Sequence, residues 1–193
     1  MKYSYEDFMK EDMKIFPKLK PRRIKKNLSK SQNVNESICK ECLGFCCKTC
    51  GCYFSPDDFE KITYKYLKKE IKKGYISIIY ANKQGKAETG TFLLRVRNYG
   101  APVVDMHDYG LIGCMLVTKE GCPFSYEQRP TGGKLLIPQE PNDEFEVPNC
   151  INRYTTKECA YEWLPYKKIL YRLYRHFKWR NVKFKKELVS FKG

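Results

Sequence analysis

Histidine is scarce in this chain, which has only His107 and His176 among its 193 residues. A metal site built mainly from imidazole is therefore excluded, and any metal would be held by thiolate. The longest apolar run, residues 111–117, is far shorter than the about 18 residues that a membrane-spanning helix needs, so we expect no membrane partner. The opening MKYSYEDFMKED is too charged for a signal peptide, and we expect a cytoplasmic protein.

Sequence motifs of several enzyme classes are also missing. There is no Gly-rich phosphate loop, no Gly-x-Ser-x-Gly and no His-Glu-x-x-His. Nucleotide hydrolysis, serine hydrolysis and zinc proteolysis therefore lack support. Global disorder is excluded because 42% of the residues are hydrophobic and 15% are aromatic, enough for the core of one compact domain.

Cysteine, in contrast, is abundant, with ten residues, of which six fall in the block ICKECLGFCCKTCGC, residues 38–52. In a reducing compartment such thiols stay free or bind metal. A C-x2-C turn directs two thiolates toward one ion, so the block can supply four ligands to one centre or two to each of two centres. The candidate ligands are Cys39, Cys42, Cys46, Cys47, Cys52, Cys114, Cys122 and Cys150.

These eight thiols fit two tetrahedral zinc sites or one [4Fe–4S] cluster with spare cysteines. The pattern does not separate zinc from iron–sulfur, although zinc is favoured for protein purified in air. Two further cysteines stay open as ligands. Cys50 lies within the block, and Cys159 lies near the start of the last predicted helix, where a small buried residue is common.

The order Cys39-x2-Cys42-x3-Cys46-Cys47, followed by a lone Cys114 and by the element CPFSYEQRP at residues 122–130, resembles the CxxCxxCC zinc- or iron-chelating family of YkgJ-like cysteine-cluster proteins. The resemblance covers about residues 38–152. It implies metal chelation or iron–sulfur oxidoreductase activity, with a distant similarity to flagellin lysine methylases.

One cysteine that the resemblance leads us to expect is absent. The family continues Arg-Pro-x-x-Cys-Arg, whereas Gly133 stands at the position of that cysteine here. The missing ligand is expected to be replaced by Cys150, which follows a short insertion, or by Cys52, which precedes a helix start.

Four regions are predicted along the chain: an amphipathic helix at 1–16, a basic linker at 17–37, the cysteine-cluster domain at 38–152 and a basic helix and tail at 153–193. Strand patterns occur at 76–81, 91–97, 111–118 and 134–138. A helix is predicted to begin at Ser55-Pro56 and to end at Gly74, and a last helix over 156–179 is predicted to kink near Pro165. The fold class is α+β, a small antiparallel sheet with flanking helices, stapled by cysteine-ligated metal.

Charge is uneven, since 18 of the 37 basic residues lie in residues 14–30 and 166–193, which hold a single acid. Such segments, with interleaved aromatic residues that could stack on bases, predict a nucleic acid or other polyanion as a partner without sequence preference. The alternative is a solvated helix face. The interleaved aromatic residues are Tyr171, Tyr174, Phe177 and Trp179.

Three other residues are candidates for a role in the site. His107, between Asp105 and Asp108, could be a general base or a nitrogen ligand, or an ordinary loop residue. Arg129 and Lys134 could offset thiolate charge or hold a substrate anion. The predicted function is a metal-binding cysteine-cluster protein. The alternatives are an iron–sulfur enzyme related to lysine methylases or oxidoreductases, and a zinc-stabilised module that binds nucleic acid through its basic tails.

Overall fold

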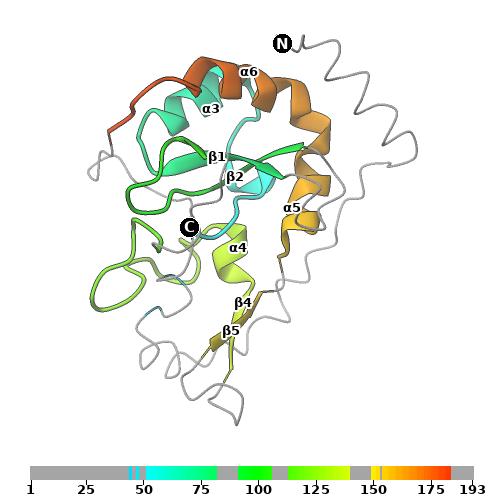
Figure 1. Cartoon of the computed structure of the whole chain (residues 1–193). Coiled ribbons are helices and arrows are strands. Elements are labelled where there is room, and N and C mark those ends of the chain that lie inside the picture. Colours follow the sequence, from blue (N-terminus) through cyan, green and yellow to red (C-terminus); the bar gives the residue numbers. More distant parts are fainter. Residues whose placement is uncertain are drawn as a thin grey trace.

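The structure is a computed structural model that describes Gly44, Cys47 and residues 51–81, 91–105, 113–139, 149–152 and 154–183 (Figure 1). The predicted helix at 1–16 and the basic linker at 17–37 lie outside the described residues. So do Cys39, Cys42, Cys46, Cys50 and His107. No helix in these described ranges is long and apolar enough to cross a bilayer.

The described part of the chain has an α+β fold. Its elements follow in the order η3 (Pro56–Asp58), α3 (Tyr64–Ile71), β1 (Ile76–Ala81), β2 (Thr91–Val96), β3 (Val104–Asp105), α4 (Thr131–Lys134), β4 (Leu136–Gln139), β5 (Asn149–Asn152), α5 (Thr156–Trp163), η5 (Leu164–Tyr166) and α6 (Lys167–Phe177).

The main sheet has the strand order β2-β1-β3. β1 and β2 pair antiparallel along their whole length, from Ile76 opposite Val96 to Ala81 opposite Thr91, which confirms both predicted strands. The expectation of a purely antiparallel sheet is wrong, because β3 pairs parallel to β1. Since β3 has only two residues, it carries too little pattern to be predicted from sequence.

The predicted strand at 111–118 is wrong over its described residues, 113–118. This segment is a series of turns with isolated bridges from Cys114 to Asn98 and from Thr118 to Gly121. Gly113 and Gly121 have φ of 82° and 98°, a left-handed backbone that interrupts a strand. The strand predicted at 134–138 is displaced: residues 131–134 form α4, and β4 then pairs antiparallel with β5 in a separate two-stranded sheet.

The helix predicted from Ser55 starts as expected but is interrupted. Ser55 caps η3 with a complete capping box, yet η3 ends at the extended residue Phe59. A second cap, Thr63, then starts α3. α3 ends at Ile71, and a turn then leads to Gly74, whose φ of 88° places the end of the helix close to the predicted one.

The C-terminal helix is kinked as predicted, with η5 at Pro165 separating α5 from α6. In Figure 1, α3 and α6 lie together along one side of the main sheet. α6 buries Leu170, Leu173 and Phe177, and its Tyr174 ring stacks on Phe92 of β2 with centroids 4.8 Å apart. The core therefore sits between this sheet and its helices.

One buried residue lowers the stability of the folded chain. Lys167 is only 8% exposed at the first position of α6, and desolvation lowers its pKa to about 8. The protonated amine is therefore destabilising at pH 7, where the folded and unfolded chains both carry it. We expect Lys167→Met to raise the free energy of unfolding at pH 7 by roughly 2 kcal/mol.

The pH dependence of the same variant gives a second readout. In the parent chain the unfolded state holds a proton that the folded state has released between pH 8 and 10.5, so stability rises with pH across that window. Lys167→Met should abolish this rise in urea titrations, and exposed Lys168→Met should not. Equal behaviour of the two variants would contradict the burial cost.

Candidate functional site

Four of the predicted cysteines line a single cavity of about 50 Å³. They come from two distant parts of the chain: the cysteine block at 38–52 and the turns at 113–122. The cysteines are Cys47, Cys52, Cys114 and Cys122, and the other lining residues are Val96, Leu116, Val117, Phe124, Arg129, Pro130, Gly133 and Leu136.

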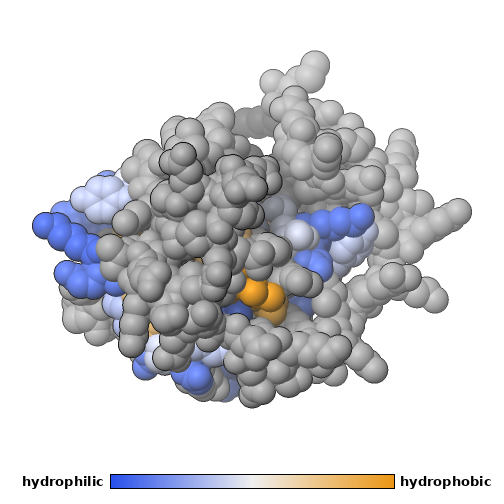
Figure 2. Space-filling model, turned by 90° about the horizontal axis from the view of Figure 1, so that it is seen from below, coloured by the Kyte–Doolittle hydropathy of each residue, from blue (hydrophilic) through white to orange (hydrophobic). Residues whose placement is uncertain are grey.

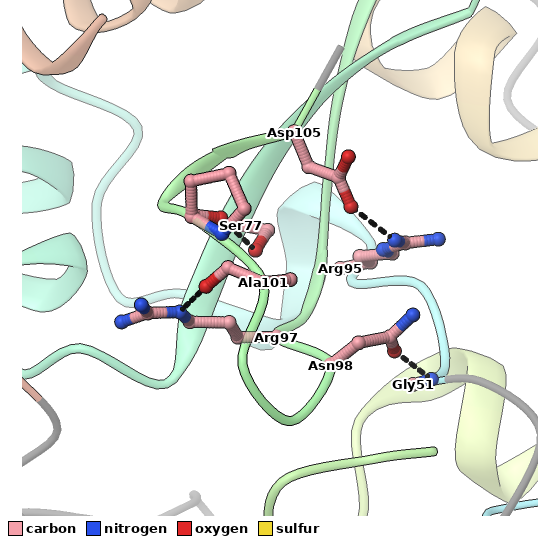
Figure 3. Close-up of polar contacts among 8 residues, drawn as sticks. Gly51, Ser77, Arg95, Arg97, Asn98, Ala101 and Asp105 are labelled. Carbon is pink, nitrogen blue, oxygen red and sulfur yellow. Dashed lines mark hydrogen bonds and ion pairs between the residues drawn. The ribbon is translucent and has the colours of Figure 1, made fainter. Parts of the chain in front are cut away.

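Backbone contacts bring Cys114 to the cysteine block. The amide of Cys114 donates to the carbonyl oxygen of Cys47 over 2.6 Å. Cys114 also forms an antiparallel bridge with Asn98, whose side-chain oxygen accepts the amide of Gly51 at 2.7 Å (Figure 3). Fully buried Asn98 thus ties the segment that carries Cys52 to the one that carries Cys114. Sequence reasoning missed it, because Asn98 before Tyr-Gly has the pattern of an ordinary turn residue.

Cys52 is fixed against the end of β2. Its carbonyl oxygen accepts the amide of Val96 at 2.8 Å. This approach requires glycine at the preceding position, since a Cβ on Gly51 would lie 2.0 Å from the Val96 oxygen. Gly132 of α4 also approaches this segment closely, because a Cβ on Gly132 would lie 2.6 Å from the carbonyl oxygen of Tyr53.

Gly133, where the resemblance leads us to expect a cysteine, lies beside Cys52. A Cβ on Gly133 would be 3.3 Å from the Cys52 sulfur. α4 is held there by Asp58, whose carboxylate accepts the amide and the hydroxyl of Thr131 at 3.0 and 2.8 Å. Of the two suggested replacements, Cys52 therefore occupies the neighbourhood of the missing cysteine.

Cys122 lies next to Gly44, another described residue of the block. A Cβ on Gly44 would be 3.3 Å from the Cα of Gly121 and 3.6 Å from the amide nitrogen of Cys122. The block thus meets the 113–122 turns at two places, at Cys114 and at Cys122.

The thiols lie within electrostatic range of one another. Burial raises the pKa of the Cys52 thiol well above its usual value, and negative charge on Cys114, Cys47, Asp58 and Cys122 raises it further. Among the described residues of the lining, Arg129 is the one cation, and its Nε donates to the carbonyl oxygen of Phe124 at 3.3 Å.

The lining is otherwise apolar. Figure 2 looks at the molecule from below, the end at which α4 and the β4–β5 pair lie in Figure 1. A hydrophobic patch is visible near the middle of this face, with hydrophilic residues to either side. Apolar side chains therefore reach the surface at this end of the molecule.

Other predicted site residues lie elsewhere. Cys150 is opposite Pro138 in the β4–β5 pair and does not line the cavity. Cys159 is fully buried in the apolar core, its sulfur 3.5 Å from the carbonyl oxygen of Phe54, as expected of a small core residue. Lys134 lies outside the lining, and Asp105 forms a buried ion pair with Arg95.

Within the described ranges, no three Cys, His, Asp or Glu side chains form a group that could hold a metal ion. The cavity brings together four of the eight predicted ligands. Three more, Cys39, Cys42 and Cys46, belong to the part of the block that is not described.

The structure limits the predicted stacking role of the C-terminal aromatic residues. Phe177 is buried and cannot stack on a base, and the half-buried Tyr171 and Tyr174 pack on Phe92 of the sheet. Trp179, at 87% exposure, is the most accessible of the four. The amphipathic pattern of α6 reflects core packing for the others.

Comparison with family models, curated proteins and solved structures yields no match. The resemblance to the cysteine-cluster family therefore stays a prediction.

Proposed function

We propose that this protein is a metal-binding cysteine-cluster protein that holds zinc or an iron–sulfur centre at the cysteine cavity. The observation that carries the proposal is the convergence of Cys47, Cys52, Cys114 and Cys122 on one small cavity from segments far apart in sequence. Sulfur is the preferred ligand of both centres. The remaining ligands would come from Cys39, Cys42 and Cys46.

The surroundings suit such a centre. Four thiolates around a divalent ion leave a net negative charge, which Arg129 in the lining would offset. The apolar wall formed by Val96, Phe124 and Leu136 limits water and keeps the sulfur–metal bonds in a low-dielectric environment. Both features support binding by the folded chain and do not choose between metals.

The enzyme alternative differs in one respect. A catalytic centre keeps a coordination position open for substrate, whereas a structural zinc site is closed. In the enzyme, Arg129 would hold an anionic substrate group beside the centre. We favour the structural role, because the cavity is small and a backbone hydrogen bond from Cys114 to Cys47 joins its two distant segments.

The test is metal analysis of the full chain after anaerobic purification, together with sulfide analysis and a visible spectrum. We expect stoichiometric zinc, or iron with sulfide and a brown colour. Cys52→Ser and Cys114→Ser should each lose most of the metal. Cys159→Ala, which changes a core cysteine outside the cavity, is the matched control and should keep it.

Cys150→Ser asks whether the centre extends to β5. Retained metal would assign the relocated ligand to Cys52, and lost metal would assign it to Cys150. Parent protein without stoichiometric metal, or cavity variants that retain as much metal as Cys159→Ala, would contradict the proposal.

A further inference from the structure

A basic surface is formed by α3, α6 and the residues that follow α6. We call it the α3/α6 basic surface and define it by Lys68, Lys72, Arg172, Arg175, His176, Lys178 and Arg180. All but Lys68 and His176 are exposed. α3 lies outside the two basic segments of the sequence, so the surface exists only because the fold sets α3 beside α6 (Figure 1).

Contacts between the helices show that these charges share one place. The Arg172 guanidinium lies 4.6 Å from the centre of the Tyr64 ring, and the Tyr64 and His176 rings are 6.4 Å apart. Desolvation lowers the pKa of His176, and the positive charges of Lys68, Arg180 and Lys72 lower it further. Residues from both helices thus create one region of positive potential.

Acidic residues compensate little of this charge. α6 contains no acid, and the one acid of α3, Glu70, is buried, where it pairs with Lys73 at 2.7 Å and accepts the Tyr75 hydroxyl at 3.1 Å. Among the described residues, no ion pair to a carboxylate involves Lys72, Arg172 or Arg175. Within the described part of the chain, no carboxylate therefore neutralises these three charges.

An exposed aromatic ring ends the surface. Trp179 is 87% exposed, directly after α6, and lies between Lys178 and Arg180 in sequence. The Lys178 ammonium lies 5.0 Å from the Trp179 ring centre. A large apolar ring in water between two cations is the combination that binds single-stranded nucleic acid, through base stacking and phosphate contacts.

We propose that the α3/α6 basic surface binds single-stranded nucleic acid without sequence preference, with a base stacked on Trp179. In a duplex the bases are stacked on one another, so fewer base faces can stack on the Trp179 ring. An anionic membrane is a less suitable partner for this surface. A helix that binds at a membrane interface inserts its apolar face into the lipid, but the apolar residues of α6, Leu170, Leu173 and Phe177, are already buried in the protein. The inference is independent of the metal site.

The test is binding of a labelled random 20-nucleotide single strand to the full, metal-loaded chain by fluorescence anisotropy. Lys72→Gln/Arg175→Gln should weaken binding by about 10-fold at 50 mM salt and flatten the slope of log K against log salt by about 1.4, as expected when two phosphate contacts to a single strand are lost. Lys119→Gln/Lys157→Gln removes the same charge from exposed positions outside this surface and should change little.

The chain has two tryptophans, and the one other than Trp179, Trp163, is fully buried. Quenching of tryptophan fluorescence on binding therefore reports stacking on Trp179. Trp179→Ala should abolish the quenching and weaken single-strand binding by about 10-fold, while binding of heparin, a polyanion without bases, should be unchanged. Metal content, measured in parallel, should be the same in every variant.

Three results would overturn the inference. The first is equal loss in the two double variants, which would place the binding elsewhere. The second is binding without tryptophan quenching. The third is binding to vesicles of anionic phosphatidylserine at concentrations where the oligonucleotide does not bind, which would assign the surface to a membrane.

Discussion

Removal of the metal by a chelator is expected to lower the melting temperature by about 8–16 °C. A ligand present at about 1,000 times its dissociation constant stabilises the folded chain by about 4 kcal/mol. In a chain of this length each kcal/mol corresponds to roughly 2–4 °C. The effect should be large here because the cavity joins segments that are far apart in sequence, such as those of Cys47 and Cys114.

The loss of stability after chelation should be confined to the part of the structure around the cavity. The main sheet has its own apolar core, in which Ile78 and Leu94 are fully buried. We therefore expect amide hydrogen exchange after chelation to accelerate at Cys114 and Thr118 and to remain slow at Ile78 and Leu94. The chelator should lower the melting temperature of Cys159→Ala by as much as that of the parent. Cys52→Ser should have a low melting temperature both with and without the chelator. An unchanged melting temperature on chelation would contradict a structural metal.

The elements that sequence predicts well are those whose own residues decide their structure. β1 and β2 are apolar runs with turn signals at their ends, and their buried faces leave a single register. The kink at Pro165 follows from the missing amide of proline, and the end of α3 near Gly74 follows from a left-handed backbone.

The elements that sequence misses depend on distant partners. Residues 113–118 have a strand-like composition, but their backbone is directed by Asn98, Cys47 and the glycines at 113 and 121. The helical turn at 131–134 forms because Asp58, more than 70 residues earlier in the sequence, binds its first amide. Local propensity does not contain these contacts.

The candidate site, too, could be predicted only in part from the sequence. Residue type alone was enough to propose the cysteines as candidate ligands, because thiols crowded in a short segment point to metal. It could not tell that Cys52 and not Cys150 would lie beside Gly133, since this depends on the close approach of α4 to Cys52 and Tyr53. It also offered Asp105 as a partner of His107, whereas the fold uses that carboxylate in the sheet.

Asp105→Ala is expected to cost about 3–5 kcal/mol in the free energy of unfolding, since it leaves a buried positive charge without its counter-ion. Arg95 of β2 reaches across β1 to Asp105 of β3, with Nη2 and Oδ2 2.6 Å apart (Figure 3). The two side chains are 3% and 0% exposed. Guanidinium denaturation of the metal-loaded protein measures the effect, and a loss below about 1 kcal/mol, the value of an exposed pair, would contradict it.

The double variant Arg95→Met/Asp105→Leu separates the charge from the packing. Replacing a buried ion pair by apolar residues of similar volume is often neutral or stabilising, so we expect the double variant to recover most of the stability lost in Asp105→Ala. Arg95 also pairs with Tyr53, the residue after Cys52, in a β-bridge made by backbone atoms. Because that bridge does not need the guanidinium, the double variant should keep its metal. Metal lost from a double variant of normal stability would mean that the Arg95 charge itself supports the cysteine cavity.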